Sequence, residues 1–562
     1  MVFINIFFVS FFCSFSLLSA GKLFNNLFIK SIKVNFFENL IFGFILLSFI
    51  GLFLNFFFSL NEKLNLIFIF IPCILYFFIN KKELKNDLIF LLLISLITVI
   101  LISLDNTNRP DAGLYHLPFI SILNESNLIV GLSNIHFRFG HISVIQYTSA
   151  IYNNILFSDN GILVPPSIIY LSLVGYLVIE AIKRNEDYFY SFLGIIFASY
   201  ALINMNRYSS WGNDDFASIL VFIIILNCYQ NFLKFNLLSF TKILLFCSVT
   251  FLIKSFYLII FLLPLVLFFK NFKNLNKKFF LNKINIFNFI FIILWFIKNF
   301  LTSSCIIFPV TFLCFDIFSW SMNDISIQNI NLISEAWAKD WPNNKIFSNY
   351  DIFIKNFNWL STWINNHLII IIKNISVLLT LIIIIRIFKN INLKNIQKKF
   401  INTFSIILFF LLLIWFIKFP LLRYGEGIIV GFFVIISFYI KFPTIKIFKF
   451  NFAILLILFI STGLLLKNLI RIKNNYNNYY IDYPWPKKNS YTHSNSKNEY
   501  NVIKKNGNIL YYVPKIGSRL CMYGPSPCAA IGVNETYFKM DKMLINKGNF
   551  LFFDMYYIEN KV

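Results

Sequence analysis

Charged and imidazole side chains collect in short polar stretches between long apolar runs. One stretch places Asp105 and Asp111 shortly before Tyr115 and His116. A carboxylate with a nearby histidine or arginine can serve as a general base, and a helix that begins near Asp111 would carry Tyr115 one turn later on the same face. Aspartate after a proline also commonly caps a helix. The stretch therefore predicts either a base or a helix cap at Asp111.

Aromatic and cationic residues alternate soon after it, in Ile-His-Phe-Arg-Phe-Gly-His at 135–141. Arg138 and His141 in this pattern suit a surface for a sugar or a lipid headgroup, and they would equally suit anchoring at a membrane interface. Both interpretations stay open for this stretch.

Two adjacent acids, Asp214 and Asp215, end a third polar stretch at 206–215 that also contains Arg207. Acids at the start of a helix stabilise its N-terminus, and they can also supply a second acid or a ligand for a divalent metal. Both interpretations stay open for this pair.

Arginine is scarce, yet Arg207 and Arg423 lie within a few residues of apolar runs, as does Lys254. A charge at that depth is costly unless it has a partner, and arginine binds phosphate or carboxylate through two parallel hydrogen bonds. Arg423 is followed by Gly425 and Gly427, whose small size would let a bulky substrate approach the backbone. The set predicts a site for a lipid-linked phosphate, although each residue alone could reach lipid headgroups or pair with an acid.

The apolar runs between these stretches identify the class of protein. Of the 562 residues, 58% are hydrophobic and only 13% are charged. A soluble protein of this length could not bury so much apolar surface, whereas lipid solvates it. We therefore expect an all-α polytopic membrane protein with about fourteen transmembrane helices, near 2–20, 36–58, 66–80, 87–104, 161–181, 189–205, 216–233, 243–253, 255–269, 285–303, 369–388, 401–418, 428–441 and 452–469.

The loops between these runs divide into two sets. Lysine-rich loops are expected on the cytoplasmic side, and the net charge of +24 has this origin rather than nucleic-acid binding. Both termini then lie outside, as do the loops 105–160 and 304–368. The transmembrane domain is expected at 1–469, and a small extracytoplasmic C-terminal domain at 470–562.

Four of the eight cysteines lie on the expected outer side in two closely spaced pairs. Near pairs in an oxidising compartment predict disulfides, here Cys305–Cys314 and Cys521–Cys528. Two separated pairs with few nearby histidines do not favour zinc, so no metal ligands are assigned. The chain has no P-loop, GxGxxG, HExxH or nucleophile-elbow motif, so ATP-driven transport and hydride transfer have no support.

The outer polar stretches resemble a known superfamily. An acid in the first large outer loop, Arg and Tyr in short outer loops and an outer C-terminal domain are similar to the GT-C superfamily of membrane glycosyltransferases. The segments Asp111–Pro118, Phe137–His141 and Cys521–Cys528 look closest to a largely uncharacterised bacterial group of GT-C-like proteins. GT-C enzymes use sugars linked to polyprenyl phosphate, an outer-loop acid as base and, in some members, a divalent metal. In many members the large outer loop follows the first span, whereas here it follows the fourth apparent one.

The resemblance implies a glycosyltransferase of the bacterial inner membrane with its active site facing the periplasm. Asp111 would take the proton from an acceptor hydroxyl on a cell-envelope glycan or lipid, and Arg423 with Lys254 and Arg207 would neutralise the leaving lipid phosphate. Its partners would be the polyprenyl-phosphate-linked sugar, the acceptor and membrane lipids, and the one cofactor implied is a divalent metal. The other residues expected to contact substrate are Tyr115, His116, Arg138, His141, Asp214 and Asp215.

Two alternatives would use similar residues. One is a flippase or transporter for lipid or polysaccharide, and the other is a polysaccharide polymerase or ligase without the GT-C fold. A transporter predicts ionisable residues near the middle of its spans, whereas those of this chain gather at one interface. A polymerase or ligase would also place arginines in outer loops, so the sequence separates it poorly from the leading hypothesis.

Overall fold

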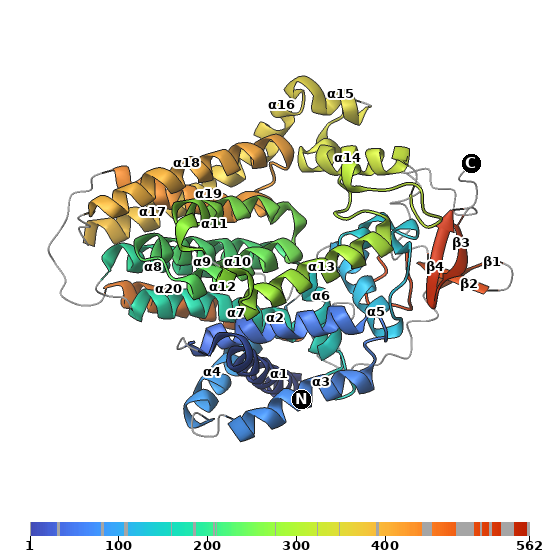
Figure 1. Cartoon of the computed structure of the whole chain (residues 1–562), viewed down its shortest axis with the longest axis horizontal. Coiled ribbons are helices and arrows are strands. Elements are labelled where there is room, and N and C mark those ends of the chain that lie inside the picture. Colours follow the sequence, from blue (N-terminus) through green and yellow to red (C-terminus); the bar gives the residue numbers. More distant parts are fainter. Residues whose placement is uncertain are drawn as a thin grey trace.

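Long helices lie side by side and carry a small β region at one end (Figure 1). The computed structural model describes the whole chain except residues 1, 31–33, 80–83, 106–110, 159, 184–186, 206–207, 209–210, 276, 323, 348, 389–392, 441–451, 479–499, 506–507, 516–519, 530–544 and 559–562. We call the end with the strands, on the right of Figure 1, the domain end.

The longer helices make up the bundle. In chain order they are α1 (Val2–Phe24, continued by the π-helix η1, Asn25–Ile29), α2 (Phe36–Leu54), α3 (Glu62–Ile79), α4 (Leu84–Ile102), α7 (Asn160–Lys183), α8 (Tyr188–Asn204), α9 (Asp214–Leu233), α10 (Leu237–Ile253), η6 and α11 (Ser255–Phe261 and Leu262–Lys270), α13 (Lys283–Ser303), α17 (Ile369–Phe388), α18 (Asn395–Lys418), α19 (Leu422–Ile436, continued by η12, Ser437–Tyr439) and α20 (Phe452–Asn478).

Shorter elements connect them, and most lie at the domain end. These are η3 (Ala112–His116), α5 (Leu117–Glu125), η4 (Leu132–Asn134), η5 (Phe137–Gly140), α6 (Val144–Tyr152), η8 (Thr311–Leu313), α14 (Asp324–Ala338), η9 (Trp341–Asn343), α15 (Tyr350–Ile354), η10 (Lys355–Phe357), α16 (Leu360–Trp363) and η11 (Ile364–Leu368), with η7 (Phe272–Asn274) and α12 (Lys277–Phe280) before α13. The strands form two antiparallel pairs, β1 (Tyr500–Lys505) with β2 (Asn508–Pro514) and β3 (Ile545–Phe550) with β4 (Phe553–Ile558).

The chain is a multi-pass membrane protein by the length and apolarity of its helices. Among the described residues, ten helices are long and apolar enough to cross a membrane, and three shorter apolar helices accompany them, at Tyr188–Asn204, Leu237–Ile253 and Ser255–Lys270. The ten are Val2–Ile29, Phe36–Leu54, Leu84–Ile102, Asn160–Ile182, Asp214–Leu233, Lys283–Ser303, Leu360–Ile387, Asn395–Lys418, Leu422–Tyr439 and Ile454–Asn478. A mostly helical membrane protein with a small β region is thus confirmed, and the count of fourteen crossings stays a prediction.

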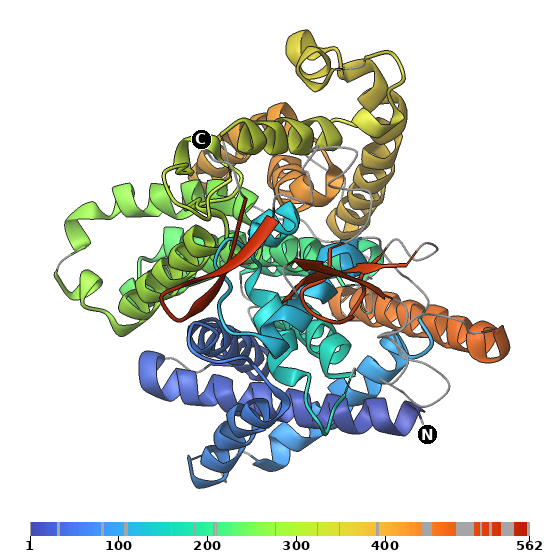
Figure 2. The same ribbon diagram turned by 90° about the vertical axis from the view of Figure 1, so that its right-hand side faces the viewer.

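The three regions predicted to face outward lie together at the domain end. Val130 exchanges backbone hydrogen bonds with the segment of β4, donating to Asp554 O at 2.8 Å and accepting from Tyr556 N at 2.9 Å. The Asn134 side chain donates to Trp320 O at 2.8 Å and so joins the first loop to the second. Figure 2 faces this end and shows the strands in front of the bundle. The shared location agrees with the prediction that these regions are on one side of the membrane.

The two predicted disulfides are confirmed, since Cys305 is bonded to Cys314 and Cys521 to Cys528. The other cysteines are buried and free, at positions 13, 73, 228 and 247.

Two boundaries differ from those expected. α10 begins at Leu237, so the run expected at 243–253 is a longer helix, because Lys242 is paired inside the protein and can be helical. α20 runs to Asn478, past the expected boundary at 470. Its extension is held by Arg471, which donates to the carbonyl oxygens of Ser103, Ile100 and Leu101 at 2.8–3.0 Å. Ile100 and Leu101 lie in the last turn of α4 and Ser103 follows it, where backbone carbonyls lack partners within the helix.

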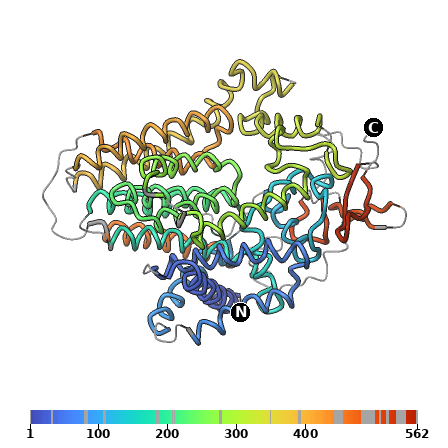
Figure 3. The backbone as a smooth tube through the Cα atoms, viewed as in Figure 1, coloured from blue at the N-terminus to red at the C-terminus, as the bar shows by residue number. Residues whose placement is uncertain are grey.

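Buried ion pairs join the helices at the end opposite the strands. Lys22 of α1 pairs with Asp87 of α4, which also accepts a hydrogen bond of 2.7 Å from Tyr76 Oη. Lys242 of α10 pairs with Glu38 of α2. Each charge has an opposite charge beside it, which offsets the cost of removing it from water. The tube in Figure 3 shows how these early helices, in blue, lie along one side of the bundle.

Candidate functional site

The carboxylate of Asp111 lies between two guanidinium groups at the domain end. Arg138 Nη1 donates to Oδ1 at 3.2 Å, and Arg423 Nη1 donates to Oδ2 at 3.1 Å. The three side chains are 30%, 27% and 35% exposed, respectively. Both carboxylate oxygens are therefore occupied by cations, yet the group remains accessible from outside.

A second carboxylate extends this arrangement. Asp214 Oδ1 accepts from Lys254 Nζ, and Asp214 Oδ2 lies 3.8 Å from Arg423 Nε. The five side chains form one row, which we call the ion chain, in the order Arg138, Asp111, Arg423, Asp214 and Lys254. Three cations and two carboxylates give it one net positive charge. Two of the residues predicted to bind a phosphate, Arg423 and Lys254, thus lie together, as the hypothesis requires.

A π-helix presents the first member of the ion chain. Asp111 precedes η3, and its side chain makes no hydrogen bond to the end of that helix. The helix-cap interpretation of Asp111 is therefore wrong, because both carboxylate oxygens bond to arginines instead. π-helical turns are rare and often mark functional sites. The guanidinium of Arg138 lies 5.2 Å from the Tyr115 ring centroid, so Asp111 and Tyr115 both reach Arg138.

The pair of Asp214 and Lys254 is set by the ends of two adjacent helices. Asp214 is the first residue of α9, where the partial positive charge of a helix N-terminus favours a carboxylate. Lys254 follows the last residue of α10 in an extended conformation. Asn213 Nδ2 donates to Ile253 O at 2.9 Å and fastens the two turns together. Asp214 and Lys254, which directly follow Asn213 and Ile253, are therefore close enough to pair.

Tyr424 is a member of the site that the sequence analysis did not assign. The ammonium group of Lys254 lies 3.4 Å from the centroid of its ring, and the guanidinium of Arg423 lies 5.1 Å from it. Arg423 Nη2 also lies 3.5 Å from Tyr424 Oη. The ring thus holds both cations, and its position directly after Arg423 was the available signal.

His116 lies beside the ion chain in a buried aromatic environment. Its ring centroid is 4.1 Å from that of Tyr115 and 5.3 Å from that of Trp211. Gln146 Nε2 lies 3.2 Å from His116 Nδ1, while Gln146 Oε1 accepts from Ser143 N at 3.0 Å. Gln146 thereby caps the start of α6, and the Ser-x-x-Gln spacing could have identified it in the sequence.

Burial acts differently on the acid and on the histidines. Burial raises the pKa of the Asp111 carboxyl, but Arg138 and Arg423 outweigh it and hold that pKa below its ordinary value of 3.8. Burial lowers the pKa of His116 from 6.5 to about 3, and the charge of Asp111 only partly opposes this shift. At neutral pH, Asp111 is therefore ionised and His116 is neutral.

The turn that carries Arg138 contains two further histidines. Arg138 N donates to His136 Nδ1 at 3.2 Å, and the ring centroid of His141 lies 5.2 Å from that of Phe308. Burial lowers the pKa of each of these histidines to about 3. His141 thus contacts an aromatic ring beside the ion chain and is not a member of it.

Other expected site residues are placed differently. Arg207 lies outside the described residues. Asp215 is buried. Burial of Tyr208 raises the pKa of that tyrosine, and the negative charge of Asp215 raises it further. Gly425 and Gly427 do not border an open space, because a Cβ on them would lie 2.5 Å from the Trp415 ring and 2.9 Å from Ser218 O, respectively. The expectation that these glycines admit a substrate is therefore wrong, and they permit helix packing.

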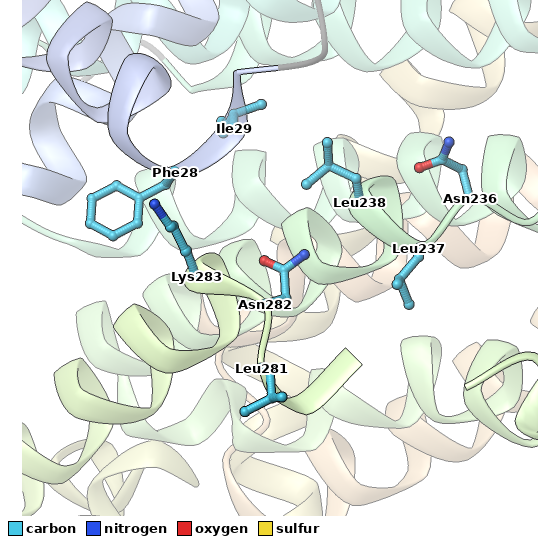
Figure 4. Close-up of a pocket in the computed structure, with 8 residues that line it drawn as sticks. All are labelled: Phe28, Ile29, Asn236, Leu237, Leu238, Leu281, Asn282 and Lys283. Atoms are coloured by element: carbon cyan, nitrogen blue, oxygen red, sulfur yellow. The ribbon is translucent and has the colours of Figure 1, made fainter. Parts of the chain in front are cut away.

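A separate hollow lies away from the ion chain. Figure 4 shows its lining side chains, which come from η1, the start of α10 and the segment before α13. It contains no member of the ion chain. Within the described ranges no three His, Cys, Asp or Glu side chains gather as a metal site. Each carboxylate of the ion chain is already paired with cations, so these residues do not fit the divalent metal that the resemblance implied.

Comparison with known proteins gave one match. A family model with the description "Domain of unknown function (DUF8201)" matches residues 1–430, a range that contains every member of the ion chain. No curated protein and no solved structure matches the chain.

Proposed function

This chain belongs to the DUF8201 family, and we propose that it is a membrane glycosyltransferase that moves a sugar from a polyprenyl-phosphate donor to an acceptor outside the cytoplasm. The proposal places it in the bacterial inner membrane with the domain end in the periplasm. The observation that carries it is the ion chain, in which Arg423 and Lys254 accompany an ionised Asp111. The resemblance to GT-C enzymes supplies the reaction type.

The charge of the ion chain suits the donor. A sugar joined to polyprenyl phosphate has one negative charge on its phosphodiester, which the single surplus positive charge would balance. Arg423 provides a planar set of donors for phosphate oxygens, and Lys254 provides a second cation next to it. A phosphate that takes hydrogen bonds from Arg423 would also weaken the hold of that arginine on Asp111.

In the transfer step the charge of the ion chain would change together with the charge of the leaving phosphate. The acceptor hydroxyl gives its proton to Asp111 while its oxygen bonds to the anomeric carbon of the sugar. The bond from that carbon to the phosphate oxygen breaks, and the leaving polyprenyl phosphate gains a second negative charge. Protonation of Asp111 raises the net charge of the ion chain to two positive charges, so it matches the leaving group as charge develops.

The neighbouring residues would form the rest of the site. The rings of Tyr115 and His116 pack at a tilt next to Asp111, and Tyr115, the less buried of the two, would offer a sugar an aromatic ring with a hydroxyl group. Arg138 would keep Asp111 oriented when the phosphate draws Arg423 away. The low pKa of Asp111 makes it a weak base that is fully ionised at neutral pH, so proton transfer would come late in the reaction.

The test is sugar transfer by protein in lipid nanodiscs, offered a panel of polyprenyl-phosphate sugars and assayed for released polyprenyl phosphate. Asp111→Asn keeps the size of the side chain but cannot take a proton, so the rate should fall by about 10² to 10⁴. Asp351→Asn is the matched control, because Asp351 is exposed and pairs with the exposed Lys355, and neither residue is a member of the ion chain. Transfer at the wild-type rate by Asp111→Asn would refute the proposed base. Movement of lipid phosphate between leaflets without sugar transfer would instead support a flippase.

A further inference from the structure

A loop closed by the Cys521–Cys528 disulfide packs on the π-helix that follows Asp111. Met522 N donates to Gly113 O at 2.9 Å, and Leu114 packs against the two half-cystines. A Cβ on Gly113 would lie 2.3 Å from Met522 Sδ, so the loop approaches η3 as closely as a glycine allows.

The same loop is also attached to α5, the helix that continues η3. Ser121 Oγ donates to Gly524 O at 2.7 Å. Tyr523 Oη donates to Asn124 Oδ1 at 3.1 Å and accepts from Asn153 Nδ2 at 2.7 Å. Ser121 lies in the middle of α5 and Asn124 near its end, so the loop restrains this helix as well as η3.

A second loop, closed by Cys305–Cys314, packs on the turn that carries Arg138. Phe308 of this loop is buried and forms a cluster with Phe137 and Cys305. The Phe308 ring also contacts His141, at the other end of the same turn. Residues on both sides of Arg138 are therefore held by the second loop.

We propose that the two disulfide-closed loops are positioning elements that hold Asp111 and Arg138 opposite each other, so that ligand binding at the ion chain requires both bridges. The identity of the ligand rests on the proposed function, whereas the positioning rests on the loop contacts alone. Each bridge forms when two thiols give two electrons and two protons to an external disulfide, which is reduced to a dithiol. The site is then completed only where such an oxidant is present.

Hydrogen exchange of the full-length protein in detergent tests the positioning. Cys521→Ser with Cys528→Ser should speed exchange at 112–125 by about tenfold or more, because the restraint on η3 and α5 is lost. Cys305→Ser with Cys314→Ser should do the same at 137–141, and α9 should be unchanged in both variants. The proposal is overturned if neither variant speeds exchange at 112–125 or 137–141. It is also overturned if each variant speeds exchange equally in both segments, because the effect would then not be local to the loop that was opened.

A second set of variants leaves both bridges intact. Gly113→Ala should push Met522 away and speed exchange at 112–125, since the added Cβ cannot share that space. Adding Met522→Ala should restore the slow exchange by making room for it. Exchange that stays fast in the double variant would show that Met522 does not position the helix.

Binding of geranylgeranyl phosphate links the positioning to the ion chain, with geranylgeraniol as the uncharged control. Each bridge variant should bind the phosphate at least about tenfold more weakly, the loss expected for a displaced charge-assisted hydrogen bond. If the wild type does not bind the phosphate while the exchange pattern is as expected, the proposed function fails and the positioning stands. If the wild type binds it and neither variant alters exchange, the positioning fails and the proposed function stands.

Discussion

Arg423 donates to the carboxylate of Asp111 across 312 residues of sequence, and this hydrogen bond joins the start of α19 to the π-helix in front of α5. The same guanidinium lies 3.8 Å from Asp214 through its Nε atom. Arg423 is thus the central member of the ion chain, and its replacement should affect both carboxylates.

Arg423→Lys separates a phosphate-binding arginine from one that only reaches lipid headgroups. Lysine keeps the charge and loses the planar donor set, so a phosphate site should bind geranylgeranyl phosphate about tenfold or more weakly. Arg423→Ala should weaken binding further. Titration of the protein in nanodiscs measures the effect, and an unchanged affinity for Arg423→Lys would contradict the phosphate site.

Arg471→Lys is the matched control, because Arg471 is not a member of the ion chain: it donates to backbone carbonyls at 100, 101 and 103 and lies 3.9 Å from Asp105 Oδ1. This variant should lower the thermal stability and leave the phosphate affinity unchanged. Arg423→Lys should lower the phosphate affinity and leave the thermal stability unchanged. A loss of affinity in both variants would mean that arginine replacement acts through the fold.

The buried histidines predict loss of stability in mild acid. The pKa values of His116, His136 and His141 are each lowered from 6.5 to about 3. Between these values the unfolded chain binds protons that the folded chain does not, so the free energy of unfolding falls as the pH falls from 6.5. The slope is at most about 1.4 kcal/mol per pH unit for each histidine. Thermal unfolding at about pH 5 and about pH 7 measures it, and His116→Gln should reduce the difference.

Gly427→Ala should destabilise the bundle. A Cβ there would lie 2.9 Å from Ser218 O and 3.0 Å from Ser218 Cα, which are backbone atoms of α9 and cannot move aside alone. Overpacking of this kind costs about 1–3 kcal/mol. Gly463→Ala in α20 is the control, because a Cβ on Gly463 would have no neighbouring atom within 4 Å among the described residues. Equal thermal stability of the two variants would contradict the packing role of Gly427.

Labelling with a membrane-impermeant maleimide tests the sidedness. Lys394 lies at the start of α18, opposite the domain end, and Ile346 lies in the outer region 304–368 with 84% of its surface exposed. Cysteines placed at these positions should react from opposite sides, with Ile346→Cys accessible from the periplasm. Reaction of both from one side would contradict the topology.

The positions of helices were predictable because lipid imposes a length and an apolar composition on each span. Asp111, Arg423 and Lys254 were predictable as a group because each is a charge near the end of an apolar run, where an unpaired charge is costly. Their order in the ion chain was not, since Arg423 pairs with Asp111 through tertiary packing alone. Gly425 and Gly427 were misread because a glycine beside a charge has the same sequence signature whether it admits a substrate or another helix. Tyr424 could be suspected only from its position directly after Arg423, because its ring contacts with both cations arise from tertiary packing.

The contact between Ser121 and Gly524 spans 403 residues, and this separation has a consequence for synthesis. At about 5–20 residues per second, a growing chain needs about 20–80 s to add those residues. Throughout that interval the helix after Asp111 exists without the loop that restrains it, whatever the state of the spans already inserted. A nascent chain therefore carries every member of the ion chain before it carries the loop closed by Cys521–Cys528, so the site is completed only after that loop has been synthesised.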